Sequence, residues 1–200
     1  MRKAIPFMKA DLAREVAGTV FATDAQGGGE LPGDAGGYGV VAATVGKDLV
    51  RQVLLEGRQP RRTVISMDGD VSRLKHPETE FKRTAPFSSV PRSLLDQAQW
   101  RDLRWGRWKF MDHITLGEGR AVIKMLSQIA SFPAAHNHCL VSLEDNMPIC
   151  GCSAKGRSSS YPLNGVLRRK AAFCLACNWG LVLPWLDTHS MPADHLSRWV

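Results

Sequence analysis

The sequence predicts a mixed α/β fold, because strand-like and helix-like segments alternate along it. Short apolar runs of the kind that form buried strands occur at residues 19–24, 139–143 and 181–186. Apolar residues recur at helical spacing between Glu118 and Phe132, and a second helical pattern follows Tyr161. Such an order of strands and helices is typical of a sheet covered by helices.

The first predicted strand, residues 19–24, ends in an acidic residue, Asp24. A glycine-rich segment separates it from a second apolar run at residues 38–45, so we expect two strands joined by a long hairpin loop. Residues 46–90 lose this periodicity and are rich in Arg, Lys, Pro and Ser. A structureless loop of this length is uncommon in a compact domain. We therefore predict one domain, residues 1–200, with 46–90 as an insertion or a partly disordered arm.

The second half of the chain supplies the remaining elements. Three tryptophans at positions 100, 105 and 108 indicate a short helix and a strand. A helix from Glu118 to Phe132 stops before Pro133, and the strand Cys139–Leu143 follows it. After a loop come a capped helix, a strand whose Pro184 favours a sheet edge, and one or two final helical turns.

Composition limits the classes of function. A chain of 200 residues suffices for one large core. Its formal net charge of +7 favours a polyanionic partner such as nucleic acid. The five cysteines, with no secretory segment ahead of them, predict an intracellular protein, in nucleus or cytoplasm, and no apolar run is long enough for a membrane span.

Four acidic residues stand out as candidate metal ligands. Asp24 and Asp145 end apolar strands, Asp194 follows one shortly, and Glu118 opens a predicted helix. Adjacent strand ends can bring such carboxylates together, and the cluster is tolerable when cations neutralise it. Oxygen ligands suit Mg²⁺ or Mn²⁺, and two such ions can hold both oxygens of a phosphodiester displacement. The alternative is that these acids lie in turns or cap helices.

Five segments resemble one known family. They are TDA with the glycine-rich hairpin, HITLGEGRA, LVSLEDN, KGRSSS with LNGVLRRKAA, and PADHLSR. In this order they resemble the ribonuclease H domain of retroelement reverse transcriptases, especially the tyrosine-recombinase (DIRS-type) group. The resemblance covers residues 8–45 and about 90–200.

The resemblance implies a ribonuclease H-like fold, a mixed five-stranded sheet with flanking helices and here a long insertion after the second strand. It implies a metal-dependent endonuclease that hydrolyses the RNA strand of RNA–DNA hybrids, leaving a 3′-hydroxyl and a 5′-phosphate. Asp24 would bridge two Mg²⁺ or Mn²⁺ ions, Glu118 and Asp145 would complete one site, and Asp194 would hold the other ion. His189 would assist product release. The partners implied are the hybrid and a reverse transcriptase polymerase domain.

Basic and polar residues after the LEDN segment are candidates for substrate contact. A loop just before a helix N-terminus can bind phosphate through cations and backbone amides together. A solvated basic face is the competing interpretation. The predicted nucleic-acid-binding residues are Asn146, Lys155, Arg157, Ser158, Ser159, Arg168 and Arg169.

Three other interpretations stay open. The chain could be a catalytically inactive ribonuclease H-like module that binds nucleic acid or protein, or another nuclease of the same fold, such as an integrase-like enzyme. Cysteine pairs at 150 and 152 and at 174 and 177 invite a structural zinc site. Cys174 and Cys177 lie in an apolar helical stretch, however, where cysteine packs as a small hydrophobic residue.

Overall fold

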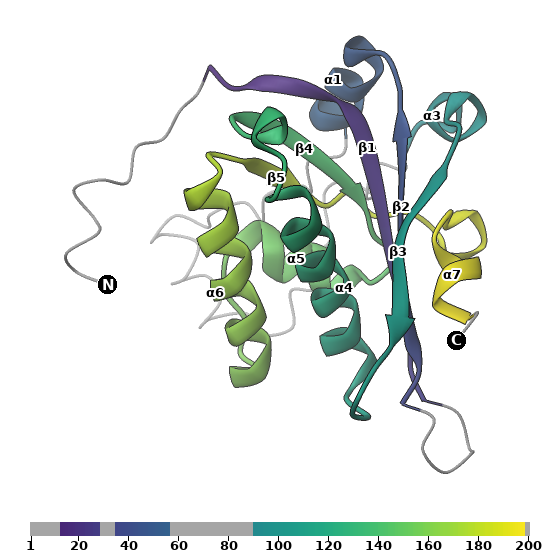
Figure 1. Ribbon diagram of the computed structural model, residues 1–200, viewed down its shortest axis with the longest axis vertical. Coiled ribbons are helices and arrows are strands. Elements are labelled where there is room, and N and C mark those ends of the chain that lie inside the picture. Colours follow the sequence, from purple (N-terminus) through teal and green to yellow (C-terminus); the bar gives the residue numbers. More distant parts are fainter. Residues whose placement is uncertain (1–12, 29–34, 57–89, 199–200) are drawn as a thin grey trace, which may run out of the picture.

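The computed structural model describes residues 13–28, 35–56 and 90–198, and its centre is one five-stranded sheet (Figure 1). The strands lie in the order β3-β2-β1-β4-β5, so that β3 and β5 form the two edges. Their bounds are β1 Glu15–Gln26, β2 Gly37–Thr44, β3 Arg101–Arg107, β4 His138–Leu143 and β5 Gly180–Val182.

The pairing of the sheet is mixed. β1 pairs antiparallel with β2, which pairs antiparallel with β3, whereas β1 and β4, and β4 and β5, pair in parallel. Asp24 on β1 lies opposite Gly39 on β2. The parallel pairing of β1 and β4 brings the carboxyl ends of these two strands to the same end of the sheet.

Helices cover both faces of the sheet (Figure 1). On one face lie α4 (Ile114–Ile129), α5 (Met147–Lys155) and α6 (Tyr161–Ala176); on the other lie α1 (Lys47–Glu56), α3 (Arg92–Gln97) and α7 (Asp194–Arg198). β1 contributes to both cores, with Phe21 in the first and Val20 in the second. Burial on both sides explains why this strand reads as a continuous apolar run.

These features confirm the predicted mixed five-stranded sheet with flanking helices. The short helix and strand expected near the tryptophans are α3 and β3. The strand at residues 181–186 is shorter than predicted, because β5 ends at Val182, before Pro184. A single bridge between Glu144 and Trp185 continues its alignment with the chain after β4.

The segment 46–90 is not irregular throughout, as its weak periodicity had suggested. Residues Lys47–Glu56 form α1, which packs on the sheet through Val50 and Val53, both buried. The apolar residues that face the core are few, and the exposed positions obscure their helical spacing. The rest of the predicted insertion, 57–89, lies outside the described residues.

Two other expectations about helices were wrong. Glu118 does not open a helix, because α4 begins four residues earlier at Ile114, where the His113 side chain accepts a hydrogen bond from Thr115 N (3.2 Å). The stretch after Asn146, expected to be a loop, is α5, which ends at Gly156 in a left-handed conformation (φ 69°). No helix in the described ranges is long and apolar enough to cross a membrane.

Candidate metal centre

Asp24 lies near one end of the sheet, two residues before Gln26, the last residue of β1. The side chain is 5% exposed. Its Oδ2 accepts a hydrogen bond from Ser197 Oγ on α7. A buried carboxylate therefore stands at the sheet end, as the sequence pattern predicted.

α4 brings Glu118 to the same place from the helical layer. Glu118 is 3% exposed, and two glycines flank it in the helix. A Cβ at Gly119 would lie 2.9 Å from Val166 Cγ1 and 3.1 Å from Ile149 Cδ1, so α4 packs tightly against α5 and α6 here. Glu118, the preceding residue, is buried beside the end of the sheet, within reach of Asp24 and Asp145.

Asp145 follows β4 in the connection to α5. Its Oδ2 accepts a hydrogen bond from Thr188 Oγ1 (2.8 Å), and its carbonyl accepts one from Trp185 Nε1 (2.9 Å). The next residue, Asn146, caps α5 by accepting a hydrogen bond from Ile149 N at Oδ1 (3.2 Å). These hydrogen bonds fix the connection between β4 and α5 at Asp145 and at the residue that follows it.

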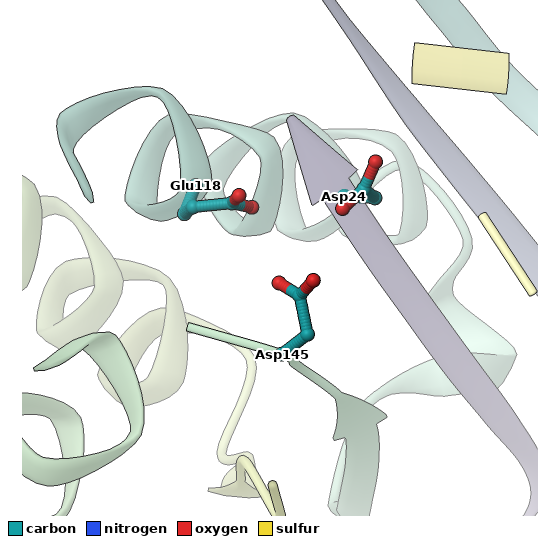
Figure 2. A group of neighbouring side chains, drawn as sticks. All are labelled: Asp24, Glu118 and Asp145. Carbon is teal, nitrogen blue, oxygen red and sulfur yellow. The ribbon is translucent and has the colours of Figure 1, made fainter. Parts of the chain in front are cut away.

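The three carboxylates converge. One oxygen each from Asp24, Glu118 and Asp145 lies within 4.8 Å of the other two. Figure 2 shows them pointing toward a common space between the end of β1, α4 and the end of β4. Among the described residues, this is the one group of three or more acidic, histidine or cysteine side chains that could hold a metal ion.

A fourth buried acid, Glu144, lies beside this group, and sequence reasoning missed it. Glu144 is fully buried, and its Oε2 accepts a hydrogen bond from Thr23 Oγ1 (3.0 Å). Its signal in the sequence was position alone, directly after an apolar strand and before Asp145. That signal is weak, because acidic residues at strand ends are usually solvated.

Burial and mutual repulsion perturb the pKa values of this cluster. Burial, and then the charges of Asp145 and Asp194, raise the pKa of Asp24 to about 6 against the opposing effect of the Ser197 hydrogen bond. Burial also raises the pKa values of Glu118 and Glu144. The charge of Glu144 raises the pKa of Glu118 further, and the charges of Asp145 and Asp24 raise the pKa values of both glutamates. Like charges packed out of water favour either protons or a bound cation.

The chemistry of these groups fits a hard divalent cation. Glu118 Oε2 and Glu144 Oε1 are buried oxygens for which the described residues provide no hydrogen-bond donor. Buried polar atoms are normally satisfied, so such oxygens need a proton or an ion. The converging ligands are all carboxylate oxygens, which Mg²⁺ and Mn²⁺ prefer.

The other two predicted catalytic residues lie outside the converging group. Asp194 is the first residue of α7, and its Oδ1 accepts a hydrogen bond from Arg198 Nε (2.8 Å) in an ion pair. It is close enough to raise the pKa of Asp24. His189 is exposed in a short 3-10 turn, Thr188–Ser190, beside the threonine that contacts Asp145.

The predicted nucleic-acid-binding residues come after Asp145, the last of the three converging carboxylates in the sequence. Lys155 ends α5, Arg157 and Ser159 are exposed in the turn before α6, and Arg168 and Arg169 are exposed on α6. Ser158 is half-buried, and its carbonyl accepts a hydrogen bond from Asn164 Nδ2 (2.6 Å).

The cysteines do not form a site of the zinc type in the described structure. Cys150 and Cys152 on α5 and Cys177 after α6 are buried, and burial raises the pKa values of all three thiols. Among the described residues, none of these thiols belongs to a group of three or more side chains placed to hold a metal ion. They pack in the core between the sheet and its helices.

No protein-family model matches this chain, and no curated protein matches it in sequence. Among solved structures, it is similar to the N-terminal RNase H domain of a Mycobacterium tuberculosis protein, determined as a fusion with maltose-binding protein. The identity is 16%, the TM-score is 0.46, and the match covers 90% of this chain and 89% of that one.

The protease–reverse transcriptase of prototype foamy virus is also similar. Its identity is 12% and its TM-score 0.46, over 94% of this chain and 21% of that one. At these identities the similarity concerns the arrangement of the chain, whereas the chemistry of the site follows from its own carboxylates.

Proposed function

We propose that this protein is a metal-dependent endonuclease that hydrolyses the RNA strand of RNA–DNA hybrids in a retroelement reverse transcriptase system. The observation that carries the proposal is the convergence of Asp24, Glu118 and Asp145 within 4.8 Å at one end of the sheet. Two of these carboxylates are buried and Asp145 is half-buried, and carboxylates so close together are stable when they share divalent cations.

The roles of the side chains follow from their positions. Asp24, Glu118 and Asp145 would bind the ions, and the hydroxyl of Thr188 would orient Asp145. Asp194, at the start of α7, would join the site after its contact with Arg198 is exchanged. When bound, two divalent ions supply an activated water and stabilise the leaving oxygen of the phosphodiester.

The net charge and the basic residues support a nucleic-acid substrate. α5 begins beside Asp145 and ends at Lys155, and a helix of this length spans about 13 Å. We infer that, when one phosphate of a nucleic-acid strand is bound at the carboxylates, Lys155 and Arg157 can contact a neighbouring phosphate of that strand. A hybrid would be recognised by its shape and by contacts to 2′-hydroxyls.

The test is cleavage of matched substrates. Purified protein is incubated with an RNA–DNA hybrid, duplex DNA and duplex RNA of one sequence, with Mg²⁺ or Mn²⁺ and with a chelator. We expect cleavage of the RNA strand of the hybrid, dependent on the metal. Asp145→Asn should lower this rate on the order of 1,000-fold, because it removes one ligand of the cluster.

A matched control removes a carboxylate elsewhere. Asp96 is exposed on α3, so Asp96→Asn should cleave the hybrid at the wild-type rate. Binding of the hybrid without cleavage would favour the inactive module instead. Cleavage of duplex DNA in preference to the hybrid would favour another nuclease of this fold.

A further inference from the structure

Ser197 on α7 donates a hydrogen bond to Asp24, although Ser197 is not one of the carboxylates that would bind metal. Its hydroxyl lies within hydrogen-bonding distance of two acceptors, Asp24 Oδ2 and the Asp194 carbonyl, the latter at 3.0 Å. A hydroxyl has one proton, and an ionised carboxylate is a stronger acceptor than an amide carbonyl. The proton of Ser197 is therefore directed mainly to Asp24.

Water has little access to this contact. Ser197 is 2% exposed and Asp24 is 5% exposed. Ser197 is the side chain that donates to Asp24 within the described structure. If the hydroxyl were removed, a buried carboxylate oxygen would lose its donor, and solvent could not readily replace it.

Gly39 makes the contact possible by letting α7 rest on the strand backbone. Gly39 lies opposite Asp24 in the sheet. A Cβ at Gly39 would lie 2.5 Å from Leu196 Cβ and 2.7 Å from the Ala193 carbonyl oxygen. Any larger residue would push α7 outward, and with it the hydroxyl that reaches across to β1.

We propose that Ser197 is a positioning residue, which orients the Asp24 carboxylate for metal binding. It engages one oxygen of Asp24 and leaves the other for an ion. The torsion that rotates a carboxylate about its last bond is broad, so Asp24 has no strong preference of its own. This inference rests on the proposed function, because it requires that the carboxylate cluster binds divalent ions.

The experiment measures metal binding separately from cleavage. Mn²⁺ is titrated calorimetrically into wild-type protein, Ser197→Ala and Ser197→Thr, and kcat and KM for the hybrid are measured on the same samples. Loss of a hydrogen-bond partner of a metal ligand lowers metal affinity by about 10- to 100-fold in other sites. We expect at least about a 10-fold loss of Mn²⁺ affinity and a lower kcat at unchanged KM in Ser197→Ala, with recovery in Ser197→Thr.

A second serine provides the matched control. Ser131 also donates to the carbonyl three residues earlier, that of Gln128 (2.7 Å), but it is exposed and remote from the carboxylates. Ser131→Ala should bind Mn²⁺ as the wild type does. Thermal melting of every variant shows whether it folds, and a melting change alone would indicate a structural role only.

The outcomes separate this inference from the proposed function. Wild-type Mn²⁺ affinity in a folded Ser197→Ala variant overturns the inference and leaves the function intact. Mn²⁺ binding that depends on Ser197, without hybrid cleavage by the wild type, overturns the function and supports the inference. Absence of Mn²⁺ binding by the wild type overturns both.

Discussion

The most buried acidic residues of the centre are held differently from Asp194. Asp24, Glu118 and Glu144 are buried in the sheet and in α4, where the chain packs closely on both sides. Asp194 lies on α7, a helix of five residues, and its carboxylate is paired with an exposed arginine. Within the described residues, no ion pair joins a member of this buried group to a basic side chain, whereas Asp194 pairs with Arg198.

This difference predicts which carboxylates would contribute most to the free energy of the proposed metal binding. Buried carboxylates that repel one another gain most from an ion, because desolvation has already raised their free energy. A carboxylate that is partly solvated and paired gains less. We therefore expect the buried group to govern whether an ion binds, and α7 to adjust how well it is held.

The sharpest test of this comparison exchanges one buried carboxylate and Asp194, in separate variants, for their amides. Asp24→Asn should lower hybrid cleavage on the order of 1,000-fold and abolish tight Mn²⁺ binding, because it removes a ligand from the buried cluster. Asp194→Asn should cost Mn²⁺ affinity only about 10-fold. Calorimetry and cleavage rates measure both. Equal losses of Mn²⁺ affinity in the two variants would show that Asp194 contributes as much to metal binding as Asp24 does.

A smaller effect is expected from a substitution that pushes α7, with Asp194, away from the sheet. Gly39→Ala should lower the free energy of unfolding by about 3 kcal/mol, because its Cβ would overlap Leu196 and the backbone of α7. Chemical denaturation measures this change. Gly46, where a Cβ would meet nothing within 4 Å, is the matched control as Gly46→Ala. A Gly39→Ala variant as stable as Gly46→Ala would contradict the close approach of α7.

The smallest effect is expected from pH in the metal-free protein. The pKa of Asp24 is raised from 3.8 to about 6, so the folded state keeps a proton that the unfolded state loses. This contribution to the free energy of unfolding is fully present below pH 4 and is lost as pH rises through about 6, on the order of 3 kcal/mol in total, spread over about two pH units. The raised pKa values of Glu118 and Glu144 extend the loss to higher pH.

Urea denaturation at a series of pH values checks this expectation. Asp24→Asn should flatten the loss between pH 4 and 6, and saturating Mg²⁺ should flatten it in the wild type, because the ion replaces the proton. A decline of the same size in Asp24→Asn would assign the pH dependence to other groups.

Residues whose setting is local were predictable from the sequence. Asp24 and Asp145 end apolar runs, and the order of strands and helices predicted the sheet that unites them. Pro184 correctly indicated an edge, where β5 lies. Each of these signals depends on neighbours within a few positions along the chain.

Residues whose setting depends on distant partners were not predictable. Ser197 matters because it meets Asp24, 173 positions away. Glu144 is buried and accepts a hydrogen bond from Thr23, 121 positions away, and this contact leaves no periodic pattern in the LEDN segment. The α5 helix was also not predicted. Asn146 caps its start, but an asparagine after a strand is equally consistent with a substrate contact, which is the role predicted for it from the sequence.

The two edges of the sheet have a consequence for how the protein can be handled. An open edge strand is a template on which another chain can add a strand, which leads to aggregation. β5 is only three residues long and precedes a proline, so it offers little template. β3 is longer but carries Arg101, Arg104 and Arg107, whose charges repel a second copy of the same strand. Both edges thus discourage self-association at the concentrations that calorimetry requires.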